Sequence, residues 1–145
     1  TQMVGLIVTG HGHFATGLTS SVDLIAGPQP NYVAVDFDGN GTEKLEADLK
    51  AAFETLKDCS GIIVFSDLAG GSPFKTAALI SAGNDKVRVL AGTNLSMLCE
   101  ISMARTMIDD LEMLVSSAIS VGKDGVQMFE MPVINNGPAD GDDGI

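Results

Sequence analysis

The chain is poor in the residues that build disulfide frameworks and metal sites. It has no tryptophan, one tyrosine, two cysteines and two histidines in 145 residues. Cys59 and Cys99 stand alone, without the spacing of metal ligands or of a disulfide scaffold. Asp36 and Asp38 lie close together but lack the further ligands that a metal needs. We therefore expect no metal and no cofactor.

Basic residues and long apolar runs are also scarce. Eight Lys and Arg against 19 Asp and Glu give a formal net charge of −11. A surface of that sign repels nucleic acid and anionic membranes but attracts a basic protein partner, so we expect no nucleic-acid partner. No apolar run approaches the ~20 residues of a membrane helix, and the N-terminus lacks the basic segment of a signal peptide. We expect a cytoplasmic protein.

What the chain does have is enough apolar residues for one compact core. Hydrophobic residues make up 45% of the composition and the mean hydropathy is +0.26. These values are typical of a globular chain rather than a disordered one. We expect one domain over residues 1–134. Residues 135–145 are rich in Gly, Asp and Asn, which predicts an acidic flexible tail.

Apolar runs alternate with segments of helical spacing along the chain. Strands are predicted at 4–8, 32–37, 61–65 and 87–91, and helices at 14–26, 42–57, 73–82, 95–105 and 109–121. This alternation predicts an α/β fold: a doubly wound, mainly parallel open sheet with helices on both faces. A short fifth strand is predicted at 125–130, at an edge because Pro132 follows. Four methionines are expected to fill the core: Met97, Met103, Met107 and Met113.

The first candidate site is the segment Gly10-His11-Gly12-His13, at the end of the first apolar strand. The flanking glycines let the backbone turn sharply and leave the His11 imidazole uncrowded. His11 then stands at the carboxyl end of a strand, where open α/β sheets place their ligand crevice. The chain holds only these two histidines, so imidazole chemistry is confined to this turn.

The second candidate segment, Asp67 to Ser72, follows the third strand. If strands one and three are neighbours, Asp67 meets His11, and a carboxylate on one ring nitrogen leaves the other as a nucleophile. Ser72-Pro73 fits the N-cap and first residue of a helix. The backbone N–H groups of Gly70 and Gly71, with the Ser72 hydroxyl, then form an anion site. A nucleophile beside such a site suggests phosphoryl transfer through a phosphohistidine.

Each of these residues also has a structural interpretation. His11 is read as an ordinary loop residue, Asp67 as a cap and the double glycine as a plain helix start. His13 either donates to a phosphoryl oxygen or merely lines the crevice. Asn94 either forms a hydrogen bond in the crevice or adopts a turn conformation.

Three motifs in order, LIVTGHGHFATGL, FSDLAGGSPF and GTNLSMLCE, resemble the IIA component of the mannose family of the bacterial phosphoenolpyruvate:sugar phosphotransferase system. The resemblance covers about residues 3 to 130. The variant TGHGHFA with DLAGGSPF and GTNL is closer to the N-acetylgalactosamine/galactosamine branch, and mannose, fructose, sorbose and gluconate systems remain open.

The resemblance implies a role for each matching residue. His11 corresponds to the histidine that takes a phosphoryl group on Nε2 from the phosphocarrier protein HPr and passes it to a IIB component. Asp67 corresponds to the carboxylate on the other ring nitrogen, and Gly71 and Ser72 to the oxygen-binding helix start. A permease formed by IIC and IID is then an indirect partner.

The family fold is homodimeric, with an antiparallel edge strand exchanged between subunits, for which residues 128–133 are the candidate. The chain has His13 and Ala69 where some members carry an aromatic residue and a tryptophan. Two other functions stay open. One is a regulatory phosphocarrier subunit of a dihydroxyacetone-kinase-type system, and the other is an anion-binding module without catalysis.

Overall fold

The computed structural model of the protein describes residues 3–133. Within that range strands and helices alternate as the sequence predicts, with helix ends shifted by a few residues. The strands are β1 (Gly5–His11), β2 (Tyr32–Phe37), β3 (Ile62–Ser66) and β4 (Val87–Leu90), and the helices are α1 (Phe14–Ala26), α2 (Glu43–Thr55), α3 (Ser72–Ile80), α4 (Leu95–Ala104) and α5 (Leu111–Asp124).

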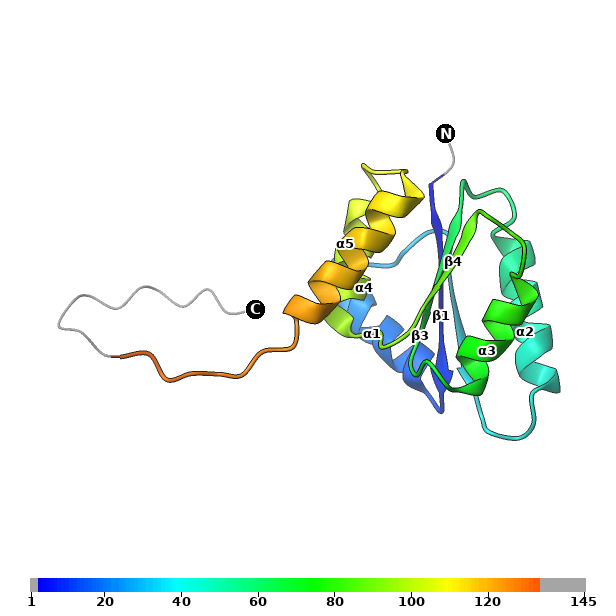
Figure 1. Cartoon of the computed structure of the whole chain (residues 1–145), viewed down its shortest axis with the longest axis horizontal. Helices are drawn as coiled ribbons and strands as arrows, with labels where there is room; N and C mark the ends of the chain where they lie inside the picture. The colour runs from blue at the N-terminus through cyan, green and yellow to red at the C-terminus, as the bar shows by residue number, and fades with distance from the viewer. Residues whose placement is uncertain (1–2, 134–145) are drawn as a thin grey trace.

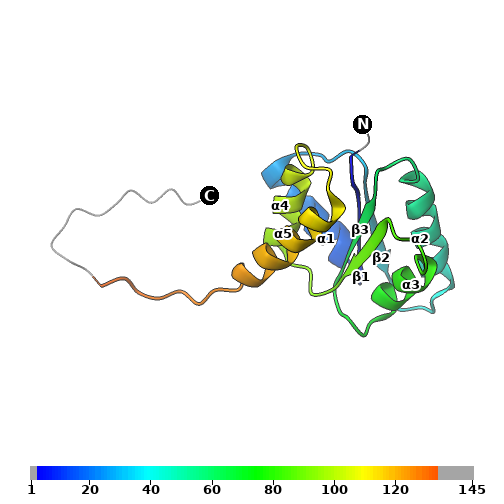
Figure 2. The same cartoon turned by 45° about the horizontal axis from the view of Figure 1, so that its top comes forward.

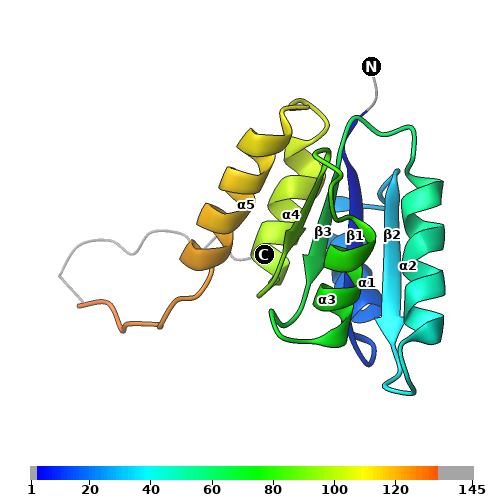
Figure 3. The same ribbon diagram turned by 45° about the vertical axis from the view of Figure 1, so that its right-hand side comes forward.

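The described strands form one open, parallel sheet in the order β2-β1-β3-β4. Helices α1, α4 and α5 cover one face of it, and α2 and α3 cover the other (Figures 1 and 2). Figure 3 shows β2 and β4 at the two edges of the sheet, with α2 alongside β2. The predicted doubly wound architecture is confirmed.

The central strand β1 is apolar on both sides because each side meets a different core. Leu6 and Val8 belong to the cluster that includes residues of α1, α4 and α5. Ile7, between them, belongs to the cluster with α2 and α3. All three side chains are fully buried, and each such burial contributes about 1.5–3 kcal/mol.

The strand order reverses at β1, which pairs with β2 on one side and with β3 on the other. In open α/β sheets the ligand crevice lies at such a reversal, outside the carboxyl ends of the strands. Thr9 of β1 is in register with Ser66 of β3. His11 and Asp67 therefore leave the same edge of the sheet side by side.

The predicted fifth strand at 125–130 is wrong for the single chain. Residues 126–133 carry no strand, and their large apolar side chains are exposed: Val126, Met128, Phe129, Met131 and Val133. A strand needs a neighbouring strand to pair with, and within the described residues no strand pairs with this segment. Exchange of residues 128–133 between subunits stays a prediction, and the tail at 135–145 lies outside the described residues.

The methionines fill the core only in part. Met97 is 3% exposed, but Met103, Met107 and Met113 are 50%, 91% and 55% exposed, so core filling was wrong for these three. Helical spacing identifies a face and does not show what covers it. Among the described residues, no helix has the length and apolar character needed to cross a membrane.

Candidate functional site

Two glycines shape the turn that presents His11. A Cβ on Gly10 would lie 2.4 Å from the Phe14 ring, so the first residue of α1 packs on β1 only because Gly10 has no side chain. Gly12 has φ +60°, in the left-handed region that glycine adopts without strain. The chain therefore turns away directly after His11 and leaves its ring half exposed, at 46%.

Asp67 holds His11 by two hydrogen bonds to the same carboxylate oxygen. Oδ2 lies 2.7 Å from His11 Nδ1 and accepts the His11 backbone N–H at 2.8 Å. Oδ1 accepts the backbone N–H of Leu68 at 2.7 Å. Because a carboxylate only accepts, Nδ1 carries the ring proton and Nε2 keeps a free lone pair. The structure thus brings together the two residues that the sequence singled out.

The charge of Asp67 fits this arrangement. Burial alone would raise the pKa of its carboxyl group, but the hydrogen bonds from the backbone and ring of His11 and from the backbone of Leu68 hold that pKa below its ordinary value. Asp67 is therefore ionised at neutral pH and can accept the Nδ1 proton of His11 in a hydrogen bond.

Phe37 and Gly71 position the His11 ring. The Phe37 ring meets it edge to face, with centroids 5.6 Å apart and planes at 68°. A Cβ on Gly71 would lie 2.7 Å from His11 Cε1 and 3.5 Å from Nε2, so the ring occupies the space that a side chain there would fill. Gly71 is required for this close approach.

The start of α3 lies beside His11 Nε2. The helix begins at Ser72 with Gly71 as its N-cap, so the prediction that Ser72 is the cap was wrong by one residue. The Gly71 N–H bonds the carbonyl of Leu68, and Pro73 has no N–H, which leaves the N–H groups of Ser72 and Phe74 as donors in the first turn. The Gly71 N–H predicted for the anion site is therefore already bonded, and Gly70 lies in the exposed loop before the helix. An anion site formed by the remaining donors and the Ser72 hydroxyl stays a prediction.

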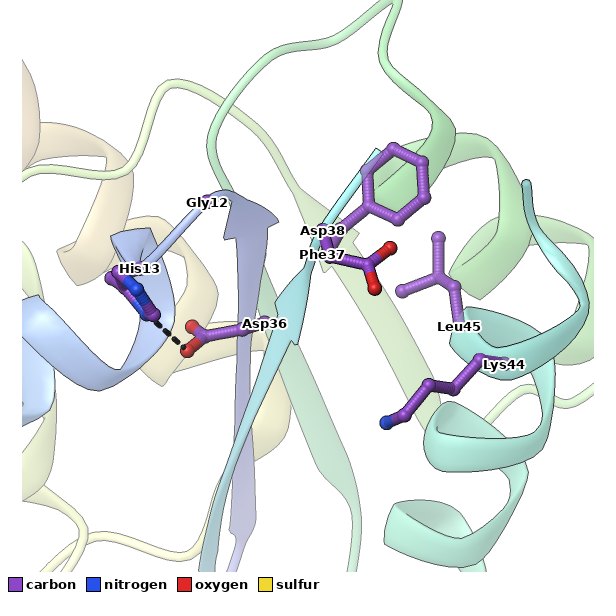
Figure 4. A pocket seen from close by; sticks show the side chains of 7 residues that line it. All are labelled: Gly12, His13, Asp36, Phe37, Asp38, Lys44 and Leu45. Atoms are coloured by element: carbon purple, nitrogen blue, oxygen red, sulfur yellow. Dashed lines mark hydrogen bonds and ion pairs between the residues drawn. The ribbon is translucent and has the colours of Figure 1, made fainter. Parts of the chain in front are cut away.

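His13 is paired with a different carboxylate. Its Nδ1 lies 3.3 Å from Asp36 Oδ2, and the side chain is 94% exposed. Both residues line a cavity of about 350 Å³ at the edge of the sheet, and in Figure 4 they lie on one side of β2 while the side chains of α2 project from the other. The lining residues are Gly12, His13, Asp36, Phe37, Asp38, Lys44 and Leu45.

Asn94 has a structural role at the start of α4. Its side-chain oxygen accepts the N–H of Met97 and so caps α4, and its amide donates to the carbonyl of Gly122 in α5 at 2.8 Å. Asn94 therefore joins two helices, and the structure does not bring it into the group formed by His11 and Asp67.

Two contacts of the site were missed from the sequence. Phe37 was taken as part of a strand and Asp36 as an incomplete metal ligand. Successive side chains of β2 point to opposite faces of the sheet. Phe37 is in register with His11, and Asp36 points to the other face, toward α1. Among residues 3–133 no three His, Cys, Asp or Glu side chains gather to hold a metal ion.

The chain matches the model of a known family. The family model EIIA-man, described as PTS system fructose IIA component, matches residues 5–119. The chain belongs to this family, as the motifs predicted.

Individual relatives agree with that assignment. The chain is 31% identical over 138 residues to the mannose-specific EIIAB component of Escherichia coli K12, covering 94% of this chain and 43% of that protein. It therefore spans less than half of that relative. It is also 31% identical over 104 residues to the fructose-specific EIIA component of Bacillus subtilis, covering 71% of each.

A solved structure agrees as well. The phosphotransferase system component EIIA from Streptococcus agalactiae has a TM-score of 0.77 and 33% identity, covering 87% of this chain and 97% of that one.

Proposed function

We propose that the protein is a cytoplasmic phosphoryl carrier of a sugar phosphotransferase system. In this proposal His11 Nε2 accepts the phosphoryl group of phospho-HPr and passes it to a IIB component, which serves a IIC/IID permease. The observation that carries the proposal is the 2.7 Å contact from His11 Nδ1 to Asp67, which leaves Nε2 free beside the start of α3. Membership of the IIA family supports it.

The proposed transfer step uses this geometry. The Nε2 lone pair forms a bond to phosphorus while the donor's nitrogen–phosphorus bond breaks, and the electrons of that bond return to the donor ring. Nδ1 keeps its proton, and Asp67 balances the positive charge that grows on the His11 ring. The N–H groups of Ser72 and Phe74 bind the phosphoryl oxygens, where the helix dipole also favours negative charge. Onward transfer to IIB is the reverse step with a new acceptor.

The test is phosphorylation of the full chain by phosphoenolpyruvate, enzyme I and HPr, with the modified residue identified by mass spectrometry. The proposal predicts an acid-labile phosphate on His11 and onward transfer to IIB that is lost in His11→Asn. An unmodified wild-type chain would refute the proposal. The identity of the acceptor tests the alternative function: phosphate delivered to a dihydroxyacetone-kinase subunit and not to IIB would assign the chain to that system.

The same proposal includes a homodimer. Residues 126–133 expose five large apolar side chains, and β4 pairs within the described chain only with β3. Residues 128–133 of a second copy carry four of these side chains, and pairing with a free sheet edge would cover apolar surface and satisfy the open backbone groups. Light scattering of the full chain should give twice the monomer mass, and Phe129→Asp should shift it toward the monomer. A wild-type monomer would contradict this part.

The names of the relatives include mannose and fructose. The amino-sugar branch remains a prediction from the motifs.

A further inference from the structure

The chain contains a second histidine–aspartate pair, formed by His13 and Asp36. Asp36 accepts three hydrogen-bonding contacts: the backbone N–H of Thr16 at 3.0 Å on Oδ1, and the Thr16 hydroxyl at 2.7 Å and His13 Nδ1 at 3.3 Å on Oδ2. Two hydrogen bonds from Thr16 of α1 therefore hold the carboxylate in place independently of His13.

This pair repeats the arrangement of the first pair on the opposite face of the sheet. His11 leaves β1 toward Asp67 after β3, beside the start of α3. His13 leaves the same turn toward Asp36 of β2 and occupies the N-cap position of α1. Phe37 packs in the core of α2 and α3, so its neighbour Asp36 points the other way, toward α1.

The partners of Asp36 determine which His13 nitrogen is free. Burial alone would raise the pKa of Asp36, but the hydrogen bonds from Thr16 and His13 hold it below its ordinary value, so the group is ionised at neutral pH. An ionised carboxylate only accepts, which requires the proton of neutral His13 to be on Nδ1. Nε2 then has a free lone pair on a side chain that is 94% exposed.

From this geometry we infer that His13 Nε2 is a second phosphoryl acceptor, subsidiary to His11. The inference rests on the proposed function for its physiological donor, a protein phosphohistidine. The Nε2 lone pair bonds to phosphorus, the donor's nitrogen–phosphorus bond breaks with its electrons returning to the donor ring, and Nδ1 keeps its proton against Asp36. The product is a phosphohistidine at the rim of the cavity shown in Figure 4.

His13 should react more slowly than His11. Its contact to the carboxylate is longer, 3.3 Å against 2.7 Å, and its ring is far more exposed, 94% against 46%. His11 also has Phe37 and Gly71 around its ring. A less restrained nucleophile is less well oriented, and we expect a rate roughly tenfold or more below that of His11.

The experiment uses the full chain without a histidine tag, because residues 11 and 13 are then its only histidines. Wild type, His11→Asn, His13→Asn and the double variant are treated with phospho-HPr and, separately, with phosphoramidate. Phosphorus NMR and mass spectrometry then identify the residue and the ring nitrogen. We expect His11→Asn to gain a slow phosphate on His13 Nε2 and the double variant to gain none.

Two aspartate variants give matched controls. Asp36→Asn should slow phosphorylation of His13 several-fold and add the Nδ1 isomer, while the rate at His11 stays unchanged. Asp67→Asn should slow phosphorylation of His11 several-fold and add the Nδ1 isomer there, while the rate at His13 stays unchanged. Thr16→Val, which removes one hydrogen bond to Asp36, repeats the test with a smaller change should Asp36→Asn fail to fold.

The outcomes separate the two proposals. If phospho-HPr labels the wild type but not His11→Asn, the inference that His13 is a second acceptor is overturned, and the proposed function is unaffected. A wild type that phospho-HPr does not label would overturn the proposed function, and the phosphoramidate arm would still decide whether Asp36 activates His13. The inference would be refuted if His13 were labelled on both nitrogens at a rate that Asp36→Asn and Thr16→Val do not change. That result would show that His13 reacts only because its side chain is exposed.

Discussion

The absence of a side chain at Gly71 determines where the His11 ring can lie. Gly71→Ala would put a methyl group 2.7 Å from His11 Cε1 and push the ring away from its place beside α3. We expect phosphorylation by phospho-HPr to slow roughly 10- to 100-fold, because small misplacements of reacting groups have effects of that size. The φ of −83° at Gly71 suits alanine, so folding stability should change little.

Gly17→Ala is the matched control for that substitution. Gly17 lies in α1 with nothing within 4 Å of an added Cβ. It should leave the phosphorylation rate unchanged and stabilise the chain by about 0.5–1 kcal/mol, since glycine is unfavourable inside a helix. Equal rates for wild type and Gly71→Ala would show that His11 does not depend on this contact.

Asp67 makes stability depend on pH in a predictable direction. Its folded pKa lies below the ordinary value of 3.8, so the folded state binds its proton less readily than the unfolded state. Its contribution is full above pH 3.8 and is lost as the pH falls through the folded pKa. The difference in unfolding free energy between wild type and Asp67→Asn should therefore shrink in acid. A difference that grows on acidification, measured by urea unfolding, would contradict the hydrogen-bond pattern.

At the scale of secondary structure, Asn94 joins α4 to α5. Asn94→Ala removes the cap on Met97 N–H and the bond to the Gly122 carbonyl. We expect a loss of about 1–2 kcal/mol of stability and no change in phosphorylation rate per folded molecule. Thermal unfolding and the labelling assay measure the two effects. A slower phosphorylation rate with unchanged stability would show that Asn94 acts in the site.

A buried arginine ties three segments together at the far end of the sheet. Arg105, just after α4, is 2% exposed and donates to the carbonyls of Val4 and Asn31 at 3.0 and 2.9 Å. It also donates to Gln29 and Pro30 in the connection before β2. Burial lowers its pKa to about 10, so it remains charged at neutral pH.

Arg105→Ala should therefore destabilise the fold by about 3 kcal/mol or more, because it removes four hydrogen bonds between these segments at once, one of them to the buried carbonyl of Val4. Arg88→Ala is the matched control: Arg88 pairs with exposed Glu112, and loss of such a pair changes stability by about 0–1 kcal/mol. Equal losses in urea unfolding would show that Arg105 does not join these segments.

At the scale of the whole molecule, much of the fold follows from local patterns. The regular alternation of strands and helices defines the doubly wound sheet, and parallel strands place His11 and Asp67 at one edge. Gly71 and Ser72 were found because a helix start after a strand has a recognisable sequence. Predicting these parts requires only the local sequence and the assumption that strands one and three are neighbours.

The contacts that were missed depend on longer-range geometry. Phe37 against His11, and Asp36 against His13, require the register of β2 on β1. Exposure of Met107 depends on how the turn after α4 packs, and residues 126–133 depend on a neighbour that the described chain does not supply. Apolar spacing carries no information on any of these.

Phosphorylation of His11, and the ring nitrogen on which it occurs, is the most direct test of the proposed function. Nitrogen-15 NMR of the His11 imidazole, before and after treatment with phospho-HPr, should show Nδ1 protonated throughout and the new phosphorus bond at Nε2. Phosphorus on Nδ1, or a His11 ring that phospho-HPr leaves unchanged, would contradict a transfer site built from His11 and Asp67.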